Sequence, residues 1–145
     1  MLQANVAQLF EYQRERLQLL LVCGNLDAPI AINHQHASPA DLVGHLNLIH
    51  PDRIQVIGAP EINWATQQHA VRVSRHMDEI IASHPPAVIV ADGCPIPATV
   101  REACERSSTA LFSTPQAAAT VIDLLRIWLS RQLAETTELH AVMMD

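Results

Sequence analysis

The chain has 145 residues, of which 49% are apolar and only 17% are charged. This composition is too hydrophobic for an intrinsically disordered protein, and the length is typical of one globular domain. All nine basic residues are scattered arginines, and the formal net charge is −6. The pattern excludes a basic nucleic-acid-binding surface. The missing lysine excludes a phosphate-loop lysine and Schiff-base chemistry within this chain.

Several features argue against a membrane or secreted protein. The longest apolar runs, Leu19–Cys23 and Ala87–Ala91, have five residues each, whereas a spanning helix needs about 20. The first residues show neither a basic region nor a small-residue cleavage pattern. Three cysteines are too few for a disulfide scaffold. We therefore expect a cytoplasmic protein with reduced thiols.

The first third of the chain predicts few regular elements. Helical spacing of apolar residues begins at Val6, and a short buried strand is expected over Leu17–Cys23, ended by Gly24-Asn25. Residues 27–51 are the least regular, with a possible short strand at Ile30–Ile32. Ser38 followed by Pro39 is typical of a helix start.

From residue 53 onward, strands and helices alternate. The expected strands are Arg53–Gly58, Ala87–Ala91 and Ala110–Phe112. The expected helices are Thr66–Ser83, Ile96–Ser107 and a long one that Ser113-Thr114-Pro115 caps and that runs to Gln132. A last strand is expected over Leu139–Met144. This order predicts an α/β fold, with a single, mainly parallel sheet flanked by helices.

Two predicted turns carry polar side chains just after neighbouring strands. Asp92 follows one apolar strand, and Ser113 and Thr114 follow the next. Because ligands of open α/β sheets bind beyond the carboxyl ends of the strands, these three residues form a candidate ligand crevice. The alternative is that they only cap helices and shape turns, which is the commoner role of such residues.

Histidines and one cysteine are weaker candidates. His34 and His36, with His45 and His50 downstream, invite a metal site, but nothing in their spacing makes three or four ligands converge, so surface histidines are favoured. Cys94 precedes a predicted helix, yet no histidine or arginine adjoins it in sequence. An inert thiol is the favoured interpretation.

Four segments, in this order, resemble a known family. They are Pro51-Asp-Arg-Ile-Gln-Val-Ile-Gly58 with Glu61-Ile, Pro85-Pro-Ala-Val-Ile-Val90, the helix Pro97 to Arg106 leading to Ala110-Leu-Phe-Ser-Thr-Pro115, and Thr136-Thr-Glu-Leu-His140-Ala-Val-Met-Met-Asp145. Together they resemble the N-terminal half of HPr kinase/phosphorylase. The likeness is strongest over residues 40–145 and weaker before them.

The resemblance implies a division of the chain and a function for the whole protein. Residues 1–134 would be the N-terminal α/β domain, similar in fold to the first domain of Mur ligases. Residues 135–145 would be the linker and first strand of a truncated catalytic domain. The family phosphorylates a serine of the phosphocarrier HPr with ATP or pyrophosphate and Mg²⁺, reverses that reaction, and works as a homohexamer. The partners implied are HPr, the chain's own catalytic domain and further copies of the chain, without nucleic acid or membrane.

One catalytic residue of the family has a counterpart, His140. Ala141 follows it where the family has glycine. The phosphate-binding loop that His140 would serve is expected about fifteen residues further on, beyond Asp145. The chain alone is therefore expected to be inactive, with no cofactor-binding or metal-binding residue of its own.

Three functional hypotheses follow. The first is a regulatory or assembly domain of a bifunctional HPr kinase/phosphorylase. The alternative is a stand-alone domain that senses a nucleotide sugar or sugar phosphate. The third is a small enzyme with Cys94 as its nucleophile.

Overall fold

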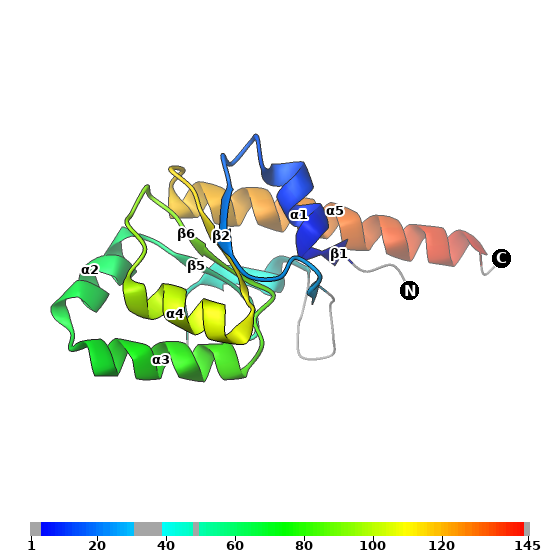
Figure 1. The fold of residues 1–145 in the computed structure, drawn as a ribbon. Coiled ribbons are helices and arrows are strands. Elements are labelled where there is room, and N and C mark those ends of the chain that lie inside the picture. Colours follow the sequence, from blue (N-terminus) through cyan, green and yellow to red (C-terminus); the bar gives the residue numbers. More distant parts are fainter. Residues whose placement is uncertain (1–3, 31–38, 48–49, 144–145) are drawn as a thin grey trace.

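A five-stranded sheet forms the centre of the protein (Figure 1). The computed structural model describes residues 4–30, 39–47 and 50–143, with side chains for all of these except 39–40 and 133–143. The strand order is β2-β7-β6-β5-β4, in which β4 to β7 are parallel and β2 is antiparallel to β7 at one edge. The strands are β2 (Leu20–Cys23), β4 (Val43–His45), β5 (Ile54–Ile57), β6 (Ala87–Val90) and β7 (Ala110–Ser113). A separate antiparallel pair joins β1 (Ala4–Asn5) to β3 (Pro29–Ile30).

Helices cover both faces of the central sheet (Figure 1). One face carries α2 (Ala59–Gln67), α3 (Ala70–Ala82) and α4 (Ala98–Ser107). The other carries α1 (Val6–Gln13) and α5 (Ala118–Met143). A short 3₁₀ turn, η1 (Pro39–Leu42), packs against α5. The predicted α/β class with a mainly parallel, helix-flanked sheet is confirmed.

Two hydrophobic cores result, one on each face of the sheet. Ile89 and Phe112 point into the core beneath α1 and α5. Val88 and Leu111, their neighbours along the same strands, point into the core beneath α3 and α4. Because successive strand residues face opposite sides, a strand buried on both faces must be apolar throughout, as β6 is.

Most strands lie where the sequence predicts them, with small differences in length. The predicted strands contain β5 and β6 and cover β7 except for its last residue, Ser113, while the strand predicted from Leu17 begins only at Leu20. Gln18 between them has a left-handed backbone (φ 52°), which breaks the extended run. β4 was not predicted, because three residues with a central glycine give no pattern. Of the segment Ile30–Ile32, residues 31–32 lie outside the described ones, as do Ser38, His34 and His36.

The helix predicted over Thr66–Ser83 is wrong in its first part. The structure has two helices there, α2 ending at Gln67 and α3 beginning at Ala70. The His69 side chain accepts a hydrogen bond from Val71 N (3.3 Å) and so starts α3 anew. The start of α2 was missed, although Pro60 in its first turn and Glu61 as a capping residue are typical of a helix beginning.

The strand predicted over Leu139–Met144 is also wrong. α5 continues without interruption to Met143, so residues 139–143 are helical. A strand needs a neighbouring strand for its backbone hydrogen bonds, whereas a helix satisfies them within itself. Among the described residues, no helix, α5 included, combines the length and apolarity needed to span a bilayer. The division into 1–134 and 135–145 rests on the resemblance and stays a prediction.

A buried glutamine supports the tight connection between β4 and β5. Gln55 is fully buried in β5. Its Oε1 accepts from Asn47 N (3.0 Å), and its Nε2 lies 3.0 Å from both the His50 and the Arg53 carbonyl oxygens. Parallel strands usually need a connection of a dozen or more residues. The connection between β4 and β5 is shorter than that, and the Gln55 side chain bonds three of its backbone groups.

Candidate functional site

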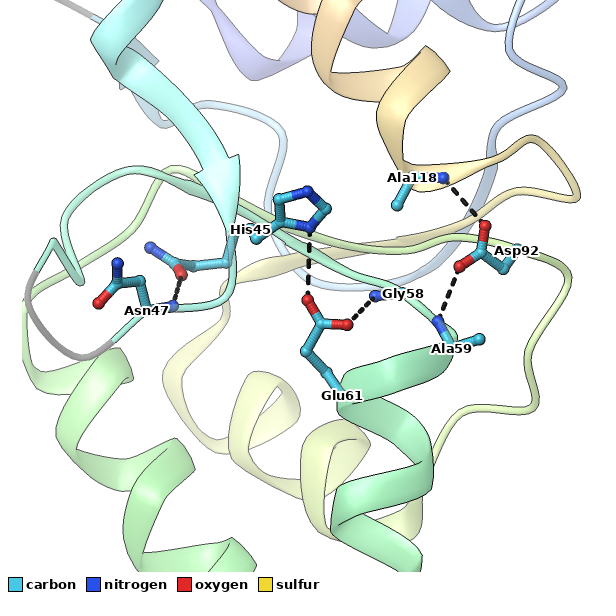
Figure 2. Close-up of polar contacts among 8 residues, drawn as sticks. His45, Asn47, Gly58, Ala59, Glu61, Asp92 and Ala118 are labelled. Atoms are coloured by element: carbon cyan, nitrogen blue, oxygen red, sulfur yellow. Dashed lines mark hydrogen bonds and ion pairs between the residues drawn. The ribbon is translucent and has the colours of Figure 1, made fainter.

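The parallel strands β4 to β7 end at a common edge, where the polar residues of interest gather (Figure 2). His45 ends β4, Gly58 follows β5, and Asp92 comes shortly after β6. Ser113 and Thr114 stand at the end of β7. In open α/β sheets this edge is where ligands bind.

Asp92 joins two helix N-termini with one carboxylate. Its Oδ2 accepts from Ala59 N at the start of α2 (2.7 Å), and its Oδ1 accepts from Ala118 N at the start of α5 (3.0 Å) (Figure 2). Its backbone is left-handed (φ 60°), a conformation that aspartate tolerates better than most residues. At each of these two helices, one N-terminal amide therefore binds a carboxylate of the chain itself.

Gly58 is required by this arrangement. A Cβ at this position would lie 2.8 Å from Asp92 Oδ2, closer than real contacts allow, and 3.1 Å from the Ala118 Cβ, closer than most of them. Its amide faces Glu61 Oε2 at 3.3 Å, which completes the cap of α2. The absence of a side chain is thus what lets Asp92 reach both helices.

Thr114 and Ser113 lie in the adjoining turn. The Thr114 hydroxyl is buried, donates to the Leu17 carbonyl oxygen and accepts from Gln116 N (3.1 Å). Two backbone hydrogen bonds join this turn to the turn that contains Asp92. Asp92 N donates to Gln116 O (2.8 Å), and Gly93 N donates to Thr114 O (3.0 Å). Ser113 is partly buried as the last residue of β7.

The structure thus brings Asp92, Ser113 and Thr114 to one edge, but it changes how the long helix begins. α5 starts at Ala118, not at Ser113-Thr114-Pro115, and its cap comes from Asp92 across the sheet. Sequence proximity suggested the local residues, and only the fold reveals the distant one. Ligand binding by these three residues stays a prediction.

The other candidates are placed less favourably for chemistry. Burial raises the pKa of the Cys94 thiol, and the negative charges of Asp92 and Glu61 raise it further, which argues against a nucleophile. His140 lies in the helical backbone of α5, and its side chain is outside the described part. Within the described ranges no group of three or more histidine, cysteine or acidic side chains is arranged to hold a metal ion.

One contact between a histidine and a carboxylate at the edge was not predicted. His45 Nδ1 lies 3.4 Å from Glu61 Oε1, between the end of β4 and the first turn of α2 (Figure 2). Beside it opens a cavity of about 400 Å³, which we call the α2–α3 cavity. Its lining residues are Leu46, Asn47, Pro60, Glu61, Trp64, His76 and Ile80. The sequence signal for this cavity was the start of α2, which the sequence analysis did not predict.

The described residues do not fit a nucleotide with its metal. The chain contains no lysine. Asp92 accepts from the first amide of α2 and the first amide of α5, and the N-terminus of α4 has no side-chain cap. Phosphate-binding loops rely on such free amides together with a lysine. Because no lysine is present to complete such a loop, we assign no step of phosphoryl transfer to the described residues.

Comparison with known proteins places the chain in a family. Residues 4–129 match the family model described as HPr Serine kinase N terminus. The chain is 53% identical over 145 residues to the HPr kinase/phosphorylase of Azoarcus sp. (strain BH72), and 52% identical over 145 residues to that of Aromatoleum aromaticum. It covers 46% of each of these relatives. A Paraburkholderia xenovorans HPr kinase/phosphorylase is 55% identical over 108 residues, which are 74% of this chain and 34% of the relative.

The match is to one part of a longer kind of protein. The chain spans less than half the length of the curated relatives it matches. The matched family model, in contrast, covers nearly all of the sheet and the helices around it. The chain therefore belongs to the family of HPr serine kinase N-terminal domains.

Proposed function

We propose that this chain serves as the non-catalytic N-terminal domain of an HPr kinase/phosphorylase and contributes regulation or assembly. In this proposal HPr is the protein substrate of the whole enzyme. ATP or pyrophosphate and Mg²⁺ are used by the part of the enzyme that this chain does not contain. The protein works in the cytoplasm as a homo-oligomer, a hexamer by family resemblance. Its three free cysteines fit a reducing compartment.

The observation that supports a non-catalytic role is the bonding at the carboxyl edge. The Asp92 carboxylate accepts from Ala59 N and Ala118 N, and the buried Thr114 hydroxyl is bonded to Leu17 O and Gln116 N. These groups stabilise the junction of α2, α5 and β7. They are committed to the fold at the place where an α/β enzyme would hold its substrate.

Phosphotransfer by the isolated chain tests this proposal. The chain is incubated with HPr, Mg²⁺ and either ATP or pyrophosphate, and phosphoserine is measured by mass spectrometry of intact HPr. We expect no phosphorylated HPr, because no lysine is present to hold a transferring phosphate. The full-length Azoarcus relative serves as the positive control. Phosphorylation above the level without added chain would contradict the proposal.

A chimera tests the contribution to assembly. The segment of the Azoarcus enzyme that matches this chain is replaced by the chain itself, to which it is 53% identical. We expect the chimera to keep the oligomeric state and kinase activity of the parent, and removal of the segment to change either one. Light scattering after size-exclusion chromatography reports the mass. If removal changes neither the number of subunits calculated from that mass nor the activity, the domain has no role in assembly or regulation.

The α2–α3 cavity supports a second proposal, that the domain senses a small molecule. Pockets of this size hold small ligands. Thermal-shift screening against nucleotide sugars, sugar phosphates and other metabolites tests it, because a ligand at 100 times its Kd adds about 2.7 kcal/mol of stability. No shift with any member of a broad panel would count against sensing.

A further inference from the structure

The α2–α3 cavity joins three separate segments at the carboxyl ends of β4 and β5. Leu46 and Asn47 come from the chain just after β4, Glu61 and Trp64 from α2, and Ile80 from α3. Ile80 is buried and Leu46 packs against the same core, so the inner part of the cavity is apolar. The site is thus assembled by tertiary structure from segments that are distant in sequence.

An aromatic wall is held in place on one side. Trp64 is 39% exposed. His76 meets it edge to face, with ring centroids 5.3 Å apart and planes at 86°. The Arg72 guanidinium lies 5.9 Å from the Trp64 ring centroid. The large face of a tryptophan ring binds apolar and cationic groups.

Two titratable groups line the cavity, the Glu61 carboxylate and the His76 imidazole. Glu61 contributes a carboxylate, whereas no arginine is among the lining residues and the chain has no lysine. Glu61 Oε2 accepts from Gly58 N, and Oε1 has the His45 imidazole at 3.4 Å. A carboxylate offers about four acceptor positions, so these two partners leave capacity for another donor. A phosphate in this cavity would instead face the Glu61 carboxylate, while the Arg72 guanidinium lies against the Trp64 ring.

We infer that the α2–α3 cavity binds a small organic ammonium ion carried on an apolar or aromatic ring. The ammonium group pairs with the Glu61 carboxylate, and the ring packs against Trp64 and the apolar inner wall formed by Leu46 and Ile80. The inference names a ligand chemistry for the second proposed function. It does not depend on the first.

The two tryptophans of the chain provide the test. Trp64 lines the cavity, whereas Trp128 is buried beneath α5 on the other face of the sheet. The indole N–H resonances of the ¹⁵N-labelled chain are followed while 2-phenylethylamine is added at neutral pH. We expect a saturable shift of the Trp64 resonance and an unchanged Trp128 resonance. Assignment is made with Trp64→Phe, which removes one of the two signals.

Matched probes and variants separate charge from hydrophobicity. 2-Phenylethanol is the neutral counterpart and phenyl phosphate the anionic one, and both are expected to bind at least tenfold more weakly. Glu61→Gln keeps an acceptor for Gly58 N but removes the charge, and we expect it to raise the Kd of the amine about tenfold. Glu79→Gln removes an exposed charge from α3 outside the cavity and should leave the Kd unchanged.

Each other outcome has a definite meaning. A Trp64 shift that never saturates, or an equal Kd in Glu61→Gln and the unchanged chain, overturns the inference. Tighter binding of phenyl phosphate than of the amine also overturns it, but leaves small-molecule sensing standing. If both indole N–H signals of Glu61→Gln move away from their positions in the unchanged chain without ligand, the variant is misfolded. In that case the preference of the unchanged chain for the amine over the alcohol decides the question.

Discussion

At the scale of single residues, the side chain of Asp92 connects parts of the fold that are distant in sequence. Its two oxygens accept from Ala59 N and Ala118 N, 33 and 26 residues away. Both are N-terminal amides of helices, whose partial positive charge a carboxylate complements. Asp92 therefore stabilises two helices that are distant in sequence, whereas the turn-forming residues around it predicted only local capping.

Asp92→Ala is expected to lower the free energy of unfolding by about 2–3 kcal/mol. Each helix cap contributes about 1 kcal/mol, and alanine tolerates the left-handed backbone less well than aspartate. Asp92→Asn keeps one acceptor oxygen, so its free energy of unfolding should lie between those of the unchanged chain and Asp92→Ala. Urea unfolding measures these differences. Asp123→Ala, an exposed acidic residue of α5, is the control and should change stability by less than about 0.5 kcal/mol. Equal effects at Asp92 and Asp123 would refute the double cap.

Cys104 gives the fold a dependence on alkaline pH. The residue is fully buried. Burial raises the pKa of its thiol to about 12, with smaller contributions from Cys23 and Glu105. Above pH 9 the unfolded chain has lost this proton while the folded chain still holds it. Stability is therefore complete below pH 9 and falls by about 1.4 kcal/mol per pH unit as the pH rises toward 12.

The Cys104→Ala variant isolates this effect. Its unfolding free energy should decline less steeply between pH 9 and 11 than that of the unchanged chain, although its stability at neutral pH is lower because of the lost side chain. The comparison uses the difference in slope, since other groups titrate equally in both proteins. Parallel slopes would show that the Cys104 thiol is not protected from ionisation.

At the scale of elements, the position of α2 depends on a glycine that precedes it. Gly58 allows the first turn of α2 to approach Asp92 and the start of α5. Further along, His69 ends the connection between α2 and α3 by capping the second helix. The edge of the sheet therefore determines where α2 begins, and the α2–α3 cavity depends on that placement.

Two glycine substitutions test this close approach. Gly58→Ala places a Cβ 2.8 Å from Asp92 Oδ2 and should destabilise the chain by about 1–3 kcal/mol, since α2 or Asp92 must shift. Gly44→Ala in β4 meets only the Arg53 side chain, at 3.5 Å, which is ordinary contact. It should therefore be neutral or slightly stabilising. Thermal unfolding distinguishes them, and similar melting temperatures would contradict the structure around Gly58.

At the scale of the whole molecule, one sheet serves two hydrophobic cores. The core on the α5 side contains Trp128, and the core on the α3 and α4 side contains Cys104. Strands β6 and β7 contribute alternate residues to both. Neither core can keep its packing once these strands separate, so the described part of the chain should unfold as a unit.

Reporters on the two faces test this cooperativity. In a Trp64→Phe background, fluorescence reports only Trp128, while pulsed alkylation of Cys104 reports the opposite core. We expect the same urea midpoint from both measurements. Two separate midpoints would show that one layer of helices detaches before the other.

The sequence predicted the strands better than the helix boundaries, for a physical reason. β6 and β7 are apolar runs because both of their faces are covered, and such runs are visible without a structure. The break between α2 and α3 depends on a single cap at His69, which interrupts a helical pattern only locally. The strand expected near Leu139 was inferred from family resemblance and local composition, and the structure continues α5 there instead.

By itself, the sequence determined the α/β class, the alternating elements after residue 53 and the family to which the chain belongs, since burial on both faces and characteristic segments leave their mark on residue order. Only the tertiary structure decided that Asp92 caps α2 and α5, that Gln55 supports the β4–β5 connection, and that Glu61 and Trp64 share a cavity. These relations join residues that are far apart along the chain or on different elements. They depend on distances in space, and local residue patterns do not encode such distances.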